Sequence, residues 1–215
     1  LSTKIDHFIP IRHYHVNNTL PTILMCHGNG EDIGDYPVKQ LSEKFNANIC
    51  VFDYSGYGLH TCREQSESNA QQDVLAVYKY LIKNINPANI IIYGRSLGTA
   101  LACYLAYTSK RINRITPRKL ILVSPLWSAA ACVIDIKVPI DGFMNYILAP
   151  KINCETLILH GTEDKVVPYR KSYELSKLFS NLYKFVSLEG FGHNDLMKEQ
   201  YNREINMFLR NCYNE

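Results

Sequence analysis

The chain has 215 residues, of which 47% are hydrophobic and 20% are charged, and its formal net charge is +3. These values are typical of a soluble globular protein with one sizeable core, and we predict a single domain over residues 1–215. The sequence has no basic stripe and no apolar run long enough to cross a bilayer, which argues against nucleic-acid partners and membrane-spanning helices.

Short apolar runs alternate with longer helix-period segments along the chain. This pattern predicts a mostly parallel sheet with helices on both faces, preceded by an antiparallel strand within residues 8–16. Further strands are expected at residues 23–26, 49–52, 90–93, 120–123, 156–159 and 183–187. Helices are expected at residues 37–45, 66–83, from 100 onward, 171–179 and 195–209.

The seven cysteines are scattered and form no Cys-x-x-Cys pair. Such spacing suggests neither a zinc site nor a disulfide framework, so we expect no metal and no cofactor. A reduced, cytoplasmic compartment is the natural expectation for scattered free thiols.

Residues 90–105 carry the most informative pattern in the chain. A β-branched and aromatic run leads into Gly-x-Ser-x-Gly at residues 94–98, and a helical pattern follows at once. Strand, pentapeptide and helix in this order are the context of a nucleophile elbow, which lifts Ser96 off the end of a buried strand. On its own, the pentapeptide is equally typical of an ordinary turn with an inert serine.

A serine hydroxyl needs a positioned base, and the base needs an orienting acid. Asp164 follows one predicted strand, and His193 follows the last predicted strand in a glycine-rich loop. The order serine, aspartate, histidine is the one that this sheet topology requires. We therefore predict Ser96 as nucleophile, Asp164 as acid and His193 as base.

Other acids stay open as alternatives to Asp164, namely Glu163, Asp135 and Asp141. Asp164 taken alone is also a suitable helix cap. Of the other histidines, His27 and His160 precede glycines at strand ends, and we expect them to brace loops rather than to carry protons.

The oxyanion of an acyl-transfer reaction needs two backbone amides. Leu97, directly after the nucleophile, supplies one in this prediction. Asn29, between two glycines in the loop after the strand at 23–26, supplies the other, because its neighbours impose little steric demand. Tyr54, after the next strand, is predicted to wall the substrate pocket, although a strand-end tyrosine is also typical of core packing.

The stretch 124–153 is irregular and apolar, and it includes the predicted pocket residues Trp127 and Phe143. Sites in sheets of this type form beyond the carboxyl ends of the strands. We therefore expect this stretch to arch over Ser96, either as a lid or acyl-binding wall or as additional core helix.

Six short motifs follow predicted strands or lead into helices, at residues 27–30, 53–58, 92–99, 124–126, 160–164 and 192–195. With these motifs, the chain resembles the α/β-hydrolase superfamily from residue 8 to residue 209. Within it, the motifs resemble the small eukaryotic α/β-hydrolase-domain proteins that act as protein depalmitoylases on cytosolic membrane faces.

The resemblance implies the triad Ser96, Asp164 and His193, with an oxyanion hole formed by Asn29 and Leu97. It also implies a serine hydrolase that cleaves acyl esters or thioesters, with a palmitoyl-protein thioesterase favoured. Those depalmitoylases carry a lipidated, cysteine-rich N-terminal segment, and this sequence has nothing like it. We therefore expect peripheral membrane association only through a segment outside it.

Competing predictions use the same residues. A carboxylesterase, a lysophospholipase and a serine peptidase all employ this triad, with an acylated protein or a small ester as partner. A non-catalytic binding module of the same fold would usually lack the nucleophile or the base, and both are present. Dehalogenase or epoxide chemistry on this fold requires a carboxylate nucleophile at the elbow. The serine at position 96 argues against that chemistry. The sequence does not predict the oligomeric state.

Overall fold

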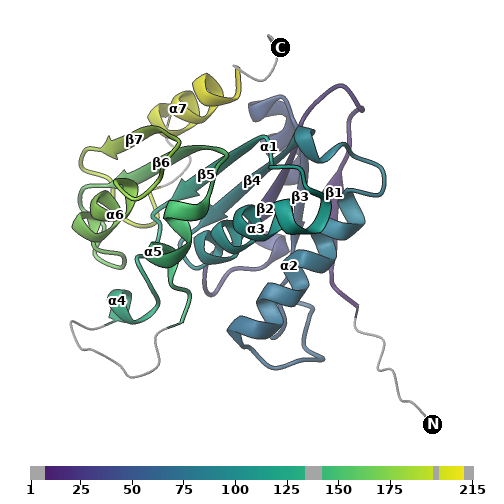
Figure 1. The fold of residues 1–215 in the computed structure, drawn as a ribbon, viewed down its shortest axis with the longest axis horizontal. Coiled ribbons are helices and arrows are strands. Elements are labelled where there is room, and N and C mark those ends of the chain that lie inside the picture. Colours follow the sequence, from purple (N-terminus) through teal and green to yellow (C-terminus); the bar gives the residue numbers. More distant parts are fainter. Residues whose placement is uncertain (1–7, 134–141, 196–198, 211–215) are drawn as a thin grey trace.

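A computed structural model describes residues 8–133, 142–195 and 199–210. Over these residues seven strands form one sheet in the order β1-β3-β2-β4-β5-β6-β7 (Figure 1). The strands are β1 (Ile11–Tyr14), β2 (Thr22–Cys26), β3 (Asn48–Phe52), β4 (Ile90–Arg95), β5 (Lys119–Val123), β6 (Glu155–Gly161) and β7 (Leu182–Leu188). All neighbours are parallel except β1, which pairs antiparallel with β3, as the alternation in residues 8–16 predicted.

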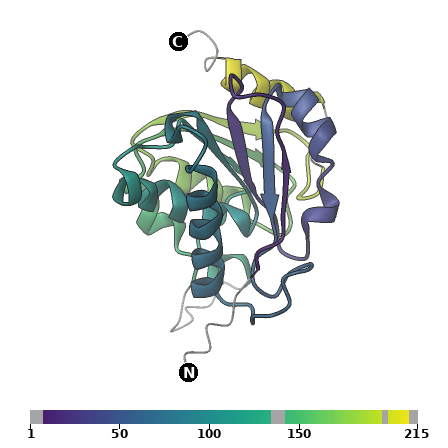
Figure 2. The ribbon, with the colours of Figure 1, turned by 90° about the vertical axis from the view of Figure 1, so that its right-hand side faces the viewer.

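Helices cover both faces of the sheet, so the predicted fold class is confirmed. In Figure 2, α2 and α3 lie on one side of the sheet and α1 and α7 on the other. The helices are α1 (Val38–Phe45), α2 (Glu67–Leu81), α3 (Gly98–Asn113), α4 (Ala130–Val133), α5 (Asn145–Leu148), α6 (Tyr169–Ser176) and α7 (Glu199–Arg210). In the described parts of the chain, three short 3-10 turns span Ile33–Asp35, Pro87–Asn89 and Ala149–Lys151.

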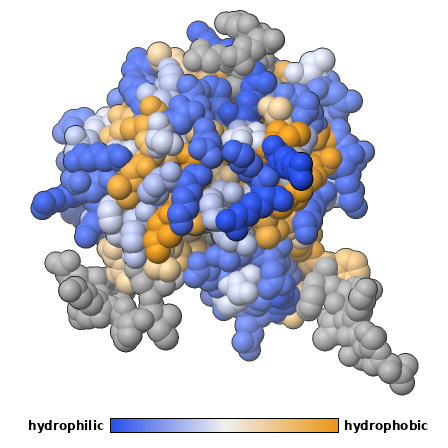
Figure 3. Space-filling view, in the orientation of Figure 1, coloured by the Kyte–Doolittle hydropathy of each residue, from blue (hydrophilic) through white to orange (hydrophobic). Residues whose placement is uncertain are grey.

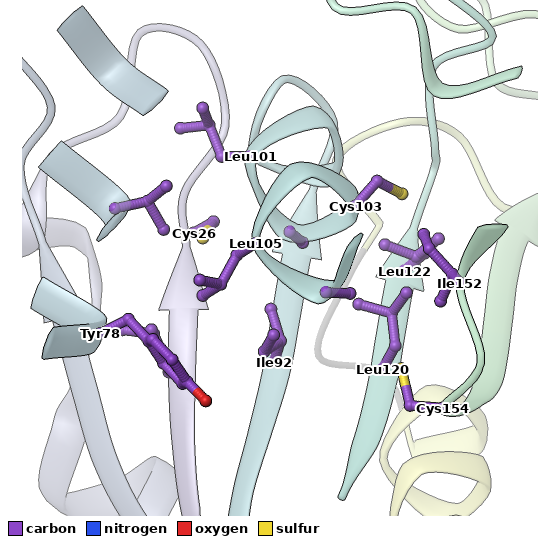
Figure 4. Packing of buried hydrophobic residues seen from close by; sticks show 14 of the residues in the cluster. Cys26, Tyr78, Ile92, Leu101, Cys103, Leu105, Leu120, Leu122, Ile152 and Cys154 are labelled. Carbon is purple, nitrogen blue, oxygen red and sulfur yellow. The ribbon is translucent and has the colours of Figure 1, made fainter. Parts of the chain in front are cut away.

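Each face of the sheet has its own hydrophobic core. Figure 4 shows Leu101 and Leu105 of α3 packed over the strands that carry Cys26 and Ile92. Every residue of β2, β3, β4 and β5 is buried, because helices cover both faces of these central strands. Such burial holds the strand ends rigidly, and the candidate site is built on these ends.

The predicted start of the last helix at Asp195 is wrong. Asp195 lies outside any helix, and its carboxylate accepts a hydrogen bond from the Gly192 amide at 2.7 Å. This bond closes a turn around His193, whereas the described part of α7 begins at Glu199. The helix predicted at residues 171–179 also lies earlier, because the fixed φ of Pro168 places the start of α6 at Tyr169.

The irregular stretch 124–153 contains two helices of four residues, α4 and α5, and α5 packs against α3. Residues 134–141 of this stretch lie outside the described residues, so its role as a lid or as core helix stays a prediction. On the face seen in Figure 3, hydrophobic residues lie in separate groups divided by hydrophilic ones. Within the described ranges, no helix combines the length and apolarity needed to cross a membrane.

Candidate active site

Ser96 sits at a sharp turn between β4 and α3. Its φ of +49° lies in the left-handed region, which costs a non-glycine residue about 1–3 kcal/mol. Three hydrogen bonds hold the turn. The Ser96 amide donates to the Val123 carbonyl at 2.9 Å, and the Thr99 amide and hydroxyl donate to the Ser96 carbonyl at 3.0 Å and 2.6 Å. The strained elbow predicted from residues 94–98 is therefore present.

Gly98 allows strand and helix to approach closely at this elbow. A Cβ on Gly98 would lie 2.2 Å from the Cys26 carbonyl oxygen, and this backbone cannot move without disrupting β2. We expect Gly98→Ala to lower the free energy of unfolding by more than about 3 kcal/mol. Gly30→Ala is the matched control, because Gly30 has a φ of +74° but open space around it. It should cost about 1–2 kcal/mol. Urea unfolding of both variants measures this difference, and equal losses would contradict the steric account.

Three side chains, each following a different strand, meet beyond the carboxyl ends of the strands. The distance from Ser96 Oγ to His193 Nε2 is 3.1 Å, and the distance from His193 Nδ1 to Asp164 Oδ2 is 2.7 Å. These residues follow β4, β7 and β6 respectively. A serine proton can therefore pass to Nε2 while Asp164 orients the ring through the hydrogen on Nδ1.

The carboxylate of Asp164 accepts hydrogen bonds at both oxygens. Oδ1 accepts from the amides of Val166 and Val167, each at 2.9 Å, and Oδ2 lies 3.2 Å from His160 Nε2. Burial alone would raise the pKa of Asp164. The hydrogen bonds from His160, His193 and the Val167 amide outweigh it and hold this pKa well below its ordinary value. Asp164 is therefore ionised and fixed.

The alternative acids differ from Asp164 in their surroundings. Glu163 is exposed, and Asp135 and Asp141 lie outside the described residues. The helix-cap alternative for Asp164 does not apply, because its carboxylate closes a turn at residues 164–167 and Pro168 precedes α6.

Asn29 and Leu97 both line an apolar cavity of about 450 Å³ together with Ser96. Neither of their backbone N–H groups has a hydrogen-bond partner among the described residues, so both are free to donate to a substrate oxygen. The Asn29 side chain is held separately, since its Oδ1 accepts a hydrogen bond from the Tyr57 hydroxyl at 2.7 Å.

The apolar cavity includes two of the three predicted pocket residues. Tyr54 and Phe143 line it, and Tyr54 is fully buried with its ring stacked on His27. Trp127 is not among the described lining residues; its ring stacks on Tyr146 with a centroid separation of 5.2 Å. A second, more polar cavity of about 630 Å³ also reaches Ser96 and lies on the side of α1 and α7.

The sequence analysis did not predict the contacts that His160 and Arg95 make near the candidate site. His160 was expected to brace a loop, and its Nε2 does donate to the Val167 carbonyl at 3.0 Å, but the same nitrogen also faces Asp164. Arg95 was read only as a variable position of the pentapeptide, and its side chain reaches both neighbouring loops. A charged residue at the end of an otherwise apolar strand was the available signal for Arg95.

Comparisons with known proteins show which proteins this chain resembles. The family described as steryl acetyl hydrolase (Say1_Mug180) matches residues 21–138, more than half of the chain. Alpha/beta hydrolase domain-containing protein 17B of Homo sapiens is 34% identical over 200 residues, which cover 89% of this chain and 67% of the relative. Protein 17C of Mus musculus is 31% identical over 196 residues, which cover 87% and 59% respectively.

Solved structures show the same fold. Est1E from Butyrivibrio proteoclasticus, solved with ferulic acid bound, has a TM-score of 0.74 and 18% identity, covering 94% of each chain. A monoacylglycerol lipase from Paleococcus ferrophilus has a TM-score of 0.70 and 16% identity, covering 96% of this chain and 98% of the lipase.

The sheet, the elbow and these comparisons define the class: the chain belongs to the α/β-hydrolase family. Within that family it is related to alpha/beta hydrolase domain-containing proteins 17B and 17C, which confirms the resemblance read from the motifs. The matched region spans 67% of the human 17B protein and 59% of the mouse 17C protein.

Proposed function

We propose that this protein is a serine hydrolase that cleaves acyl esters or thioesters through an acyl-Ser96 intermediate. The observation that carries the proposal is the continuous hydrogen-bond path from Ser96 Oγ through His193 to Asp164, with distances of 3.1 Å and 2.7 Å. This path gives a poor nucleophile the base and the orienting acid that it needs.

In the acylation step, Ser96 Oγ attacks the carbonyl carbon and its proton passes to His193 Nε2. The carbonyl oxygen becomes an oxyanion that the amides of Asn29 and Leu97 receive. The intermediate then collapses, the bond to the leaving group breaks, and His193 returns the proton to that group. Asp164 stabilises the imidazolium without taking its proton.

In the deacylation step, a water molecule takes the place of the leaving group. His193 removes a proton from the water as it attacks the acyl carbon, and the same two amides receive the second oxyanion. Collapse of this intermediate returns the proton to Ser96 Oγ and releases a carboxylic acid. This step regenerates the free enzyme, and both steps use the same residues.

The substrate that we favour is a long-chain S-acyl group on a protein at the cytosolic face of membranes. The motif resemblance and the relationship to proteins 17B and 17C support this choice. The apolar lining of the 450 Å³ cavity, with Leu101, Leu126 and Phe143, suits an acyl chain. A carboxylesterase or lysophospholipase is the second candidate, because it would use the same residues on a different leaving group.

Hydrolysis rates across an acyl series separate these candidates. Oxygen esters and thioesters with acyl chains from two to sixteen carbons should all be turned over, and we expect kcat/KM to be highest for long-chain thioesters. A maximum at short oxygen esters would favour the carboxylesterase. The absence of turnover with every compound, together with resistance to fluorophosphonates, would favour a non-catalytic binding module.

The role proposed for Asn29 depends on its backbone rather than its side chain. Asn29→Pro removes the N–H group, and we expect kcat to fall by about 10²–10³-fold. Asn29→Ala keeps the N–H group and loses only the bond to Tyr57, so kcat should fall by less than about 10-fold. Steady-state ester kinetics compare the two variants. An equal loss in both would show that the amide is not the group involved.

A further inference from the structure

Arg95 directly precedes Ser96 in the elbow, and its side chain contacts the two loops that carry Asn29 and His193. It projects from the last position of β4, and 10% of its side chain is exposed. A guanidinium group offers five N–H donors in a fixed planar fork, so it can bind acceptors on two sides at once. Acceptors from two distant loops meet it here.

One arm of the fork reaches the loop that carries Asn29. Arg95 Nη1 forms an ion pair with Glu31, whose Oε2 accepts hydrogen bonds from the Gly28 amide at 2.7 Å and the Tyr36 hydroxyl at 2.8 Å. A Cβ on Gly28 would lie 2.9 Å from Nη1, so glycine at this position leaves room for the arginine. The ion pair thus connects the elbow to the backbone just before Asn29.

The other arm reaches the loop that carries the histidine. Arg95 Nη2 donates to the His193 carbonyl oxygen at 3.2 Å and to the Asn194 side-chain oxygen at 2.7 Å. These partners are 98 and 99 residues away in the chain. The contact is made to the backbone of His193 itself, so it bears on the position of the imidazole.

We propose that Arg95 is a positioning residue that holds the Asn29 loop and the His193 loop in register with Ser96. The inference rests on the proposed function, since it assigns a role toward those reacting groups. One guanidinium joins the elbow, the predicted oxyanion loop and the base. A lysine at this position would present a single nitrogen and would serve one loop at the expense of the other.

The main test is Arg95→Lys, with kcat expressed per active site after titration by the burst of a p-nitrophenyl ester. Displacing a catalytic group by about 1 Å costs about 10²-fold in rate, so we expect kcat to fall by about 10–100-fold. KM should change by less than about threefold, because Arg95 contacts loops rather than the acyl chain. Counting active sites removes any loss that comes only from unfolded protein.

Arg118→Lys is the matched control. Arg118 is also partly buried, but it lies just before β5, at the amino ends of the parallel strands, where its side chain contacts Asn89. This variant should keep the wild-type kcat per active site.

Chemical rescue provides a second and independent readout. Arg95 lines the 630 Å³ cavity that also reaches Ser96, so a small guanidinium ion has space to enter in Arg95→Ala. Millimolar methylguanidinium should raise kcat of Arg95→Ala at least about fivefold with saturation, and equal sodium chloride should not. If Arg95→Ala does not fold, Arg95→Lys and Glu31→Gln carry the test, and both should show the same loss of kcat.

Wild-type kcat per active site in Arg95→Lys would overturn this inference and leave the proposed function standing. Loss of kcat in Arg118→Lys equal to that in Arg95→Lys would also overturn it, because the effect would then not be local to the site. If the wild-type protein itself neither hydrolyses esters nor reacts with fluorophosphonates, the proposed function fails and this inference fails with it.

Discussion

Replacing Ser96 with alanine should abolish fluorophosphonate labelling and lower kcat for acyl esters by about 10⁵–10⁶-fold. At a φ of +49°, alanine is no more strained than serine. The hydrogen bonds that hold the elbow come from backbone groups and from Thr99, so this substitution does not remove them. The far-ultraviolet circular dichroism and the urea midpoint should therefore stay close to the wild-type values.

Ser124→Ala is a close control for this variant. Ser124 follows the neighbouring strand β5, is buried and also has a positive φ, at +48°. It has no contact with His193 among the described hydrogen bonds. Labelling at the wild-type rate in Ser124→Ala and none in Ser96→Ala is the expected pair of results. Equal labelling of Ser96→Ala and the wild-type protein would remove Ser96 as the nucleophile.

Asp164→Asn should lower kcat by about 10⁴-fold, the second largest effect that we expect. An amide cannot accept all the hydrogen bonds that reach this carboxylate, and its NH₂ group would favour the wrong tautomer of His193. Glu163→Gln is the control, because Glu163 is adjacent to Asp164 but exposed. The kcat of this variant should stay within about twofold of the wild-type value. Similar losses in both variants would contradict the assignment.

The depressed pKa of Asp164 also makes a prediction about acid stability. Because the folded-state pKa lies below the unfolded-state value of about 3.9, ionisation stabilises the fold above that value. This contribution is lost as the pH falls toward the folded-state pKa. The urea midpoint of the wild-type protein should therefore decrease more between pH 7 and pH 3 than that of Asp164→Asn. Parallel decreases would contradict the pKa shift.

The central strands were predictable because their apolar runs are short, buried on both faces and bounded by turn residues. The run predicted at residues 49–52, for example, is β3 at Asn48–Phe52. Additional helix within residues 124–153 was one of two alternatives, but the positions of α4 and α5 were not predicted, since four residues are too few for a helical period to appear. Asp195 was misread because a side chain that closes a turn and one that starts a helix look alike in sequence.

The prediction that Ser96, Asp164 and His193 converge followed from the elbow motif and from the expected order of parallel strands. Parallel strands place their carboxyl ends at one edge, so residues directly after three strands must lie near one another. The contacts of Arg95 with Glu31 and Asn194 could not be predicted from the sequence. The spacing of neighbouring residues does not indicate where a side chain points or which loop it contacts. Trp127 shows the same limit, since its stacking on Tyr146 depends on how an irregular segment folds.

The most direct test of the proposed mechanism is to trap the acyl-enzyme. The protein is mixed with a palmitoyl thioester, quenched in acid during turnover, digested and examined by mass spectrometry. We predict one palmitoyl group on the peptide that contains Ser96, with its amount rising to a steady level within the first turnover. Turnover without acylation of that peptide, or with the acyl group on a cysteine such as the exposed Cys62, would contradict the account.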